Sequence, residues 1–278
     1  MDYAHPEIVA SPEWLQEHLD DPNVRVIDCA VLEAYRRAHI AGAVHMPVHY
    51  YIKEKDPAGS DHGVLVMPPA EFEELMGQLG VGPDTTVVSY DDNNGFIAAR
   101  LWWVLRYYGH TKAKLLDGGW HRWMTEGRPI TFHATKPPRA SFKAAPADAD
   151  IHASCDLLLE KYADPDWQVF DARTDAEWDG TNDRGNRRAG HVPNARHLEW
   201  ARFVTTDDRR SLRPADEIQK LLDDAGFVRG KPIITYCQGG VRAAHAFFVL
   251  HLMGYEKMRV YDGSMREWAN RDDTPLVR

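Results

Sequence analysis

Cysteine is scarce in this sequence. The 278 residues include only Cys29, Cys155 and Cys237, and no two of them form a CxxC pair. This set excludes a framework of disulfides, and it shows none of the ligand spacings that are typical of zinc sites. We therefore expect neither a secreted, disulfide-stapled fold nor a bound metal ion.

Long apolar runs are also missing. Segments such as residues 246–250 are far too short to span a bilayer. The first residues, 1–7, lack the basic and then apolar character of a signal sequence. These two observations lead us to expect a cytoplasmic protein.

Basic residues are outnumbered by acidic ones. The chain has 33 Lys and Arg against 42 Asp and Glu, which gives a formal net charge of −9. Such a surface repels phosphate backbones and anionic lipids, so we expect neither a nucleic-acid nor a membrane partner. If the substrate is an anion, the site must create its own local positive field.

Short strands and helices alternate along the chain. Apolar patterns predict strands at residues 24–28, 86–90, 113–117, 167–171 and 233–236. They predict helices at residues 11–20, 34–39, 69–79, 98–108, 119–125, 154–162 and 216–225. Residues 52–66 are polar and contain glycine, so we expect a loop there.

The same series of elements occurs twice. The shift between corresponding landmarks is 146 positions from Tyr90 to Tyr236 and 145 positions from Asp117 to Asp262. Alternating strands and helices predict an α/β fold with mainly parallel sheets and helices on both faces. The repeat predicts two tandem domains of this kind.

The limits of the two domains follow from a change in composition. Residues 131–150 are rich in Pro, Ala and Lys, which is typical of a linker. We therefore expect a first domain at residues 1–130 and a second at residues 151–278.

One stretch, residues 231–245, combines a buried strand, a glycine-containing loop and the start of a helix. Cys237 lies where the strand ends and Arg242 where the helix begins. A sulfur at a helix N-terminus meets unpaired backbone N–H groups and the positive end of the helix dipole. Gly239 and Gly240 allow the positive-φ geometry that turns N–H groups toward an anion. We expect this setting to favour the thiolate.

The two halves differ at this loop. After Tyr90 the first half has Asp91 in place of the thiol, and its loop is one residue longer. The second domain is therefore expected to carry the chemistry and the first to serve as scaffold. Cys29 follows a strand among apolar residues, and Cys155 has no basic residue nearby in sequence, so both are expected to be inert.

Several histidines and acids recur at the same place in both halves, which points to shared structure rather than metal binding. The recurring positions are His39 with His191, His45 with His197, and Asp28 with Asp171. We expect the two aspartates to cap turns or to pair with nearby arginines.

Signature stretches in both halves resemble the two-domain rhodanese family of sulfurtransferases. Residues 35–43 resemble its N-terminal signature, and residues 188–195 are a weaker copy. Residues 116–123 and 261–268 resemble its closing signature, with Met265 in place of the usual aromatic residue. The loop from Cys237 to Arg242 has the six-residue length of the family. The resemblance covers essentially the whole chain.

The resemblance implies a two-step transfer of sulfur that needs no cofactor or metal. The Cys237 thiolate attacks the outer sulfur of a small anionic donor and becomes a persulfide. Thiosulfate, the donor we favour, leaves as sulfite, and 3-mercaptopyruvate, the alternative, leaves as pyruvate. Cyanide, a thiol or a protein then accepts the sulfur.

The family's functional positions can be carried over one by one. Cys237 matches the nucleophile, and the persulfide cradle matches the backbone of Gln238, Gly239, Gly240, Val241 and Arg242. Arg184 matches an arginine that holds the carboxylate in mercaptopyruvate-using members. Trp200 and Phe96 fall where the family places aromatic residues, with Phe96 reaching over from the first domain.

This chain also departs from the family pattern. Glu177 stands where a second substrate arginine is expected, and Gly239 stands where thiosulfate-using animal members carry a lysine. Arg242 is a candidate for supplying the missing charge. The second half has nine extra residues near 178–188, in which Arg184, Arg187 and Arg188 form a basic cluster that we expect at the cleft.

Two other interpretations stay open. Some cysteine phosphatases and arsenate reductases also place Cys and Arg on a helix-opening loop, but with five residues between them, where this chain has four. A smaller ring suits a single sulfur better than a tetrahedral phosphate. The remaining alternative is a non-catalytic sulfur-carrier module, against which the intact Cys237 argues.

Overall fold

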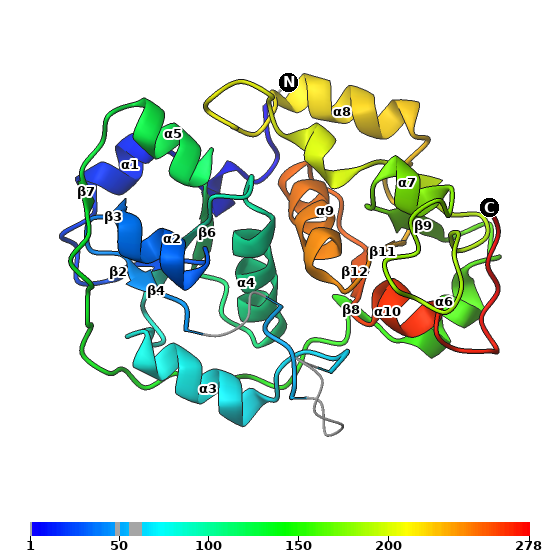
Figure 1. The fold of residues 1–278 in the computed structure, drawn as a ribbon, viewed down its shortest axis with the longest axis horizontal. Helices are drawn as coiled ribbons and strands as arrows, with labels where there is room; N and C mark the ends of the chain where they lie inside the picture. The colour runs from blue at the N-terminus through cyan, green and yellow to red at the C-terminus, as the bar shows by residue number, and fades with distance from the viewer. Residues whose placement is uncertain (1, 48–50, 56–62) are drawn as a thin grey trace.

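Two five-stranded parallel sheets form the frame of the molecule (Figure 1). The structure, a computed structural model, describes residues 2–47, 51–55 and 63–278. The first sheet has the strand order β1-β6-β5-β2-β4, built from Val9–Ala10, Ala113–Leu116, Thr86–Tyr90, Val24–Asp28 and Val44–His45. The second has the order β8-β12-β11-β9-β10, built from His152–Ala153, Met258–Tyr261, Ile233–Tyr236, Gln168–Asp171 and Arg196–His197.

The two sheets have the same topology. Each strand of the second sheet occupies the place of its counterpart in the first, with β5 and β11 at the centre. All ladders within these sheets are parallel; for example, Asp28 pairs with Tyr90 and Asp171 with Tyr236. The predicted α/β fold of two tandem domains is thereby confirmed.

Helices follow the strands on both sides of each sheet. In the first domain they are α1 (Pro12–Glu17), α2 (Leu32–Arg37), α3 (Pro69–Gln78), α4 (Phe96–Tyr107) and α5 (Gly119–Thr125). In the second they are α6 (Cys155–Lys161), α7 (Asp175–Trp178), α8 (Ala215–Asp224), α9 (Val241–Leu252) and α10 (Ser264–Trp268). Within the described ranges, no helix is long and apolar enough to cross a membrane.

Most predicted elements appear close to their expected bounds. The strands at residues 24–28, 86–90 and 233–236 are found as predicted. Helix α4 begins at Phe96, two residues before the predicted start, because Gly95 takes the N-cap position with φ +85°. Of the loop predicted at residues 52–66, residues 56–62 lie outside the described part, and an antiparallel bridge from Lys53 to Val66 closes its base.

The segment predicted as a linker packs along the first domain. Thr131 still pairs with His39 in the small antiparallel ladder of β7 (Ile130–Thr131) and β3 (His39–Ile40). Farther on, Ala140 donates a backbone hydrogen bond of 3.0 Å to Gly77 of α3, and Phe142 is buried edge-on against the ring of Phe72. The connection is therefore held in place rather than free.

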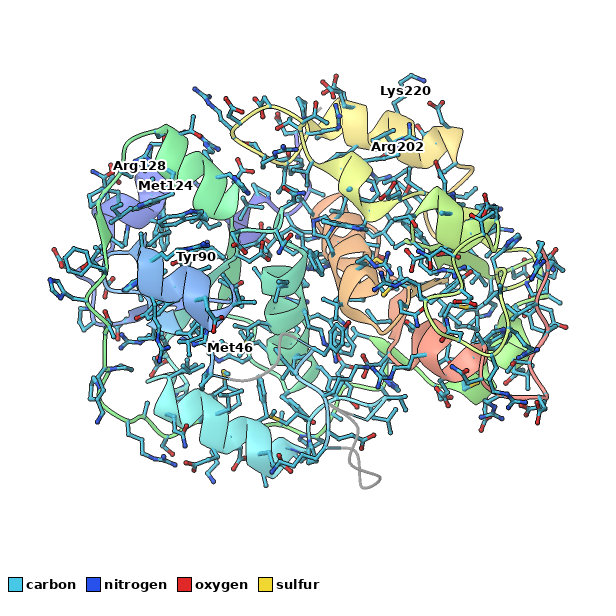
Figure 2. The ribbon with its side chains drawn as sticks, viewed as in Figure 1. Met46, Tyr90, Met124, Arg128, Arg202 and Lys220 are labelled. Carbon is cyan, nitrogen blue, oxygen red and sulfur yellow. The ribbon has the colours of Figure 1, made fainter. Side chains whose placement is uncertain are left out.

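Helices α4 and α9, which follow the two central strands, lie side by side between the domains (Figure 1). Trp102 of α4 meets Phe248 of α9 edge-on with ring centroids 5.0 Å apart, and one buried apolar cluster contains residues of both domains. Charged side chains crowd the outside, as at Lys220, whereas Tyr90 lies inside the first domain (Figure 2). The loops that open α4 and α9 consequently meet at the domain interface.

Candidate active site

The Cys237 loop connects β11 to α9. Gly240 is the N-cap residue of α9 and has φ +81°, which is the left-handed region. A Cβ atom at Gly240 would lie 2.4 Å from Asp262 Oδ1. Gly239 is not in the left-handed region, and no described atom lies within 4 Å of its Cβ position. The expectation of positive φ is therefore right for Gly240 and wrong for Gly239, because one left-handed residue suffices to turn this short loop.

The loop is fixed from below by the turn between β12 and α10. Ser264 Oγ accepts hydrogen bonds of 3.1 Å from the backbone N–H groups of both Cys237 and Gly240, and it donates one of 2.8 Å to the Tyr261 carbonyl. In return, the Cys237 carbonyl accepts from the Met265 N–H at 3.0 Å. These bonds hold the backbone on either side of the sulfur at fixed positions.

Arg242, in the first turn of α9, forms a bidentate salt bridge with Glu177 of α7. Its Nη1 and Nη2 atoms lie 2.6 and 2.8 Å from the two carboxylate oxygens. Burial raises the pKa of Glu177, but the hydrogen bonds and charge of Arg242 outweigh burial and lower that pKa to about 2. Arg242 is therefore present at the site as expected, but most of its charge is compensated by Glu177.

A small pocket of about 200 Å³ opens above the thiol. Its lining comes from both domains and consists of Tyr51, Phe96, Arg184, Cys237, Gln238, Gly239, Val241 and Arg242. Cys237 itself is only 1% exposed. Trp200 is absent from the lining formed by the described residues and instead packs on Phe96, with ring centroids 4.9 Å apart. The size of this pocket suits a donor of a few heavy atoms.

Of the expected basic cluster, Arg184 reaches the pocket. It is half exposed, and its Nε atom lies 3.8 Å from Glu177 Oε1. Arg187 turns away to pair with Asp272, and Arg188 donates hydrogen bonds to backbone carbonyls at the C-terminal end of the chain. The predicted three-arginine cluster at the cleft is therefore wrong, since the loop directs successive side chains to different partners.

The segment after α7 is also tied directly to the Cys237 loop. Asn186 and Gln238 exchange two amide hydrogen bonds of 3.1 Å each. Asn270, just beyond α10, donates a further 3.1 Å bond to the Asn186 side chain. This amide pair keeps the Arg184 segment at the rim of the pocket.

The equivalent loop of the first domain is filled by its own side chain. The carboxylate of Asp91 accepts four hydrogen bonds of 2.7 to 2.9 Å from the backbone N–H groups of Asn93, Gly95, Ile97 and Ala98. The loop is one residue longer than in the second domain, as the sequence indicated. In the first domain the backbone N–H groups that open α4 are therefore bound by the Asp91 carboxylate.

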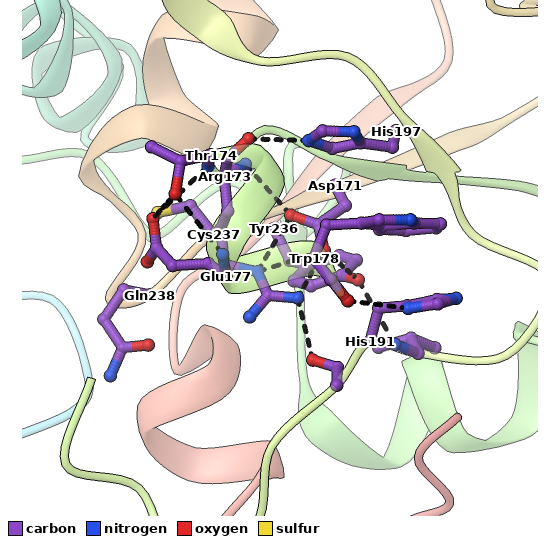
Figure 3. A network of polar contacts seen from close by, with 12 residues as sticks. Asp171, Arg173, Thr174, Glu177, Trp178, His191, His197, Tyr236, Cys237 and Gln238 are labelled. Atoms are coloured by element: carbon purple, nitrogen blue, oxygen red, sulfur yellow. Dashed lines mark hydrogen bonds and ion pairs between the residues drawn. The ribbon is translucent and has the colours of Figure 1, made fainter. Parts of the chain in front are cut away.

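The recurring acids and histidines are structural. Asp171 accepts a 2.6 Å hydrogen bond from Tyr236 and binds Arg173, while His191 stacks on Trp178, as Figure 3 shows.

The first domain contains the same kinds of contact. Asp28 accepts a hydrogen bond from Tyr90, His39 stacks on Tyr35, and His45 contacts the Ala30 carbonyl. His197 makes the equivalent contact to the Arg173 carbonyl. Among the described residues, no cluster could hold a metal ion.

The two other cysteines are poor candidates for chemistry. Cys29 and Cys155 are both buried. Burial raises the pKa of Cys29 well above its ordinary value, and burial likewise raises the pKa of Cys155. Both thiols therefore stay protonated, in agreement with the expectation that they are inert.

Several residues around the site could not be identified from the sequence. Ser264 and Asp262 lie in the closing signature, but nothing in that pattern showed that they hold the loop. Arg100 corresponds to His245 at the shift of 145 positions, but this correspondence does not predict that Arg100 contacts Asp262. Tyr51 and Lys53 approach from the first domain, and no sequence signal predicts contacts between residues about two hundred positions apart.

Comparisons with known proteins agree with this picture. The rhodanese-like domain family matches the chain twice, at residues 11–126 and 154–271. The sulfur carrier protein TtuD of Thermus thermophilus is 35% identical over 290 residues, covering 100% of this chain and 99% of that protein. A Haloferax volcanii protein, provisionally named a thiosulfate sulfurtransferase, is 33% identical over 290 residues, covering 100% and 98%.

A solved structure shares the whole architecture. SseA from Escherichia coli, described as a 3-mercaptopyruvate sulfotransferase with the rhodanese fold, superposes with a TM-score of 0.81. The two sequences are 28% identical, and the match covers 92% of this chain and 98% of that one. The arrangement of two such domains is therefore common to both proteins.

Proposed function

The chain belongs to the rhodanese family, and on that premise we propose that it transfers a sulfane sulfur from a small anionic donor through a persulfide on Cys237. The observation that carries the proposal is the position of this thiol. Cys237 sits at the N-terminus of α9, in a loop whose counterpart already binds a carboxylate through four backbone N–H groups. Such a setting stabilises a thiolate and a persulfide anion alike.

With thiosulfate as donor, the Cys237 thiolate attacks the outer sulfur. A new S–S bond forms, the S–S bond of thiosulfate breaks, and its electron pair leaves with sulfite. With cyanide as acceptor, the cyanide carbon attacks the outer sulfur, thiocyanate departs, and the thiolate is restored. We expect the backbone of Gln238, Gly239, Gly240 and Val241 to surround the transferred sulfur. We expect Arg184 and Arg242, which line the pocket, to face the donor's anionic end.

With 3-mercaptopyruvate as donor, a C–S bond breaks instead. The electron pair leaves with the enolate of pyruvate, which takes up a proton, while the sulfur remains on Cys237. Arg184 at the pocket rim is placed to hold the carboxylate. The relatives include proteins named for either donor, and we propose thiosulfate first because Glu177 replaces the second arginine that a carboxylate donor would use.

A sulfur carrier is the second candidate function. It is favoured by the 35% identity to the sulfur carrier protein TtuD over the whole chain. In that role Cys237 would take up sulfur in the same first step and release it to an acceptor protein rather than to a small molecule. The loading chemistry is shared, so the acceptor decides between the two functions.

The phosphatase alternative has weaker support. A phosphatase loop needs its arginine to bind two oxygens of a phosphate through both terminal nitrogens. Here both terminal nitrogens of Arg242 are bound to Glu177. Hydrolysis of an aryl phosphate that is lost in Cys237→Ser would nevertheless restore that interpretation.

Steady-state assays of the full chain test the proposal. Thiocyanate production from thiosulfate and cyanide, and pyruvate production from 3-mercaptopyruvate and dithiothreitol, would give kcat/KM for each donor. We expect turnover with at least one donor and none in Cys237→Ser. Uptake of sulfur without release to cyanide or dithiothreitol would favour the carrier, and no uptake from either donor would contradict both functions.

A further inference from the structure

Three charged side chains from the two domains are buried together beneath the Cys237 loop. Lys53 Nζ lies 2.8 Å and Arg100 Nη1 lies 2.7 Å from the same oxygen, Asp262 Oδ1. The three side chains are 1%, 0% and 0% exposed. Lys53 donates a further hydrogen bond of 2.8 Å to the Asp262 backbone carbonyl. Both cations belong to the first domain and the single anion to the second.

Asp262 is in direct contact with the loop that carries the thiol. Its carboxylate and its backbone carbonyl lie against Gly240, so closely that a Cβ there would come within 2.4 and 2.8 Å of them. Two residues later, Ser264 holds the N–H groups of Cys237 and Gly240. Lys53 and Arg100 of the first domain therefore bind the residue, Asp262, that lies against Gly240. Gly240 is the residue whose positive φ turns the loop.

The charges around the thiol do not cancel. Arg242 and Glu177 compensate each other in their bidentate salt bridge. In contrast, Lys53, Arg100 and Asp262 together carry one net positive charge, which is buried where Asp262 lies against Gly240. This is the local field that an acidic protein of net charge −9 needs around an anionic sulfur.

The cluster is costly for folding. Buried ions are stabilising only when every polar atom is satisfied, and here Asp262 Oδ2 and Arg100 Nη2 have no hydrogen-bond partner among the described residues. Two cations share one oxygen while the second oxygen of the same carboxylate is unused. Such an arrangement points to a role other than stability.

We propose that Lys53 is a positioning residue of the sulfur-transfer site, which together with Arg100 holds Asp262 under Gly240 and supplies the positive charge that stabilises the Cys237 thiolate and persulfide. The inference rests on the proposed function and extends it. It gives the first domain, which lacks a nucleophile, a direct part in the chemistry of the second.

The electrostatic surroundings of Lys53 agree with this role. Burial lowers the pKa of Lys53 to about 8, while the charge of Asp262 opposes the change and that of Arg100 adds to it. Cys237 also acts on Lys53, and His152 of β8 faces the same cluster. At neutral pH the Lys53 ammonium group is therefore charged, and Asp262, to which it is bound, lies against the loop that carries the thiol.

The test compares two variants with opposite effects on the charge. In the full chain, Lys53→Met removes a positive charge and Asp262→Asn removes a negative one. The readout is the rate of alkylation of Cys237 by iodoacetamide against pH, followed on the Cys237 peptide by mass spectrometry. We expect Lys53→Met to move the profile to higher pH and slow the reaction at pH 7 about tenfold. Asp262→Asn should move it to lower pH, and Lys53→Arg should restore the original profile.

The matched control is Asp117→Asn. Asp117 is the counterpart of Asp262 at the shift of 145 positions and also contacts the other domain, through the Leu212 N–H at 2.8 Å. The Asp117→Asn variant should leave the alkylation profile of Cys237 unchanged. Profiles of Lys53→Met and Asp262→Asn that shift in the same direction, or a Lys53→Met profile identical to that of the unaltered chain, would overturn the inference. Alkylation needs no sulfur donor, so this result is independent of whether the proposed function holds.

Discussion

Asp91 and Cys237 occupy the same position after the central strands of the two domains, yet only the first of these side chains fills its own loop. The Asp91 carboxylate binds four backbone N–H groups at the start of α4, whereas Cys237 ends in a single sulfur below an open pocket. The protein thus contains two versions of one anion-binding loop. In one loop the N–H groups are bound by the protein's own carboxylate, and in the other we propose that the group bound is the sulfur being transferred.

The two glycines of the loop should respond differently to substitution. Gly240→Ala places a Cβ against Asp262 at φ +81°, and we expect it to cost at least about 2 kcal/mol of stability and to abolish sulfur loading. Gly239→Ala adds a Cβ where no described atom lies within 4 Å, so stability should stay within about 1 kcal/mol. Urea unfolding of both variants provides the measurement. Equal losses in the two variants would show that the positive φ is not the cause.

The salt bridge between Glu177 and Arg242 should influence the choice of donor. Glu177→Gln leaves Arg242 uncompensated, and the gain in attraction is larger for the doubly charged thiosulfate than for the singly charged 3-mercaptopyruvate. We expect the ratio of kcat/KM for the two donors to move several-fold toward thiosulfate. Glu217→Gln, which alters an exposed pair with Arg213, is the control and should leave the ratio unchanged. A ratio unaltered in Glu177→Gln would mean that this carboxylate does not select the donor.

His245 should make stability sensitive to acid. It is fully buried in α9 beside Trp200, neither ring nitrogen has a partner among the described residues, and burial lowers its pKa to about 3. The unfolded chain takes up a proton here below about pH 6.5, which the folded chain does not do until about pH 3. Stability from this group is therefore complete above pH 6.5 and is lost as the pH falls toward 3.

The change to measure is His245→Phe. Between pH 7 and pH 5 the free energy of unfolding of the unaltered chain should fall about 2 kcal/mol more than that of the variant. The exposed His133→Phe serves as control, and its stability should follow that of the unaltered chain. Parallel pH curves for His245→Phe and the unaltered chain would contradict the assignment.

The frame of this protein could be predicted from sequence because its signals are local. The strand at residues 86–90 and the helix at residues 69–79 depend on neighbouring residues, and the repeat added an internal check through Asp117 and Asp262. The position of Cys237 at a helix N-terminus followed from the same kind of pattern.

The remainder of the site depends on contacts that no local pattern encodes. Glu177 was recognised as a departure from the family, but its pairing with Arg242 needs the relative placement of α7 and α9. Lys53 approaches Asp262 from 209 positions away. The side chains of Arg187 and Arg188 point away from the pocket because they bind partners near the C-terminal end, such as Asp272 for Arg187. In each case tertiary packing, not residue type, determined the role.

The central claim is that Cys237 becomes a persulfide. Incubation of the full chain with thiosulfate or, separately, 3-mercaptopyruvate, followed by mass spectrometry of the Cys237 peptide, measures this directly. We predict a mass gain of one sulfur on that peptide with at least one donor, none on the peptides of Cys29 and Cys155, and none in Cys237→Ser. A Cys237 peptide that gains no sulfur from either donor would contradict the account.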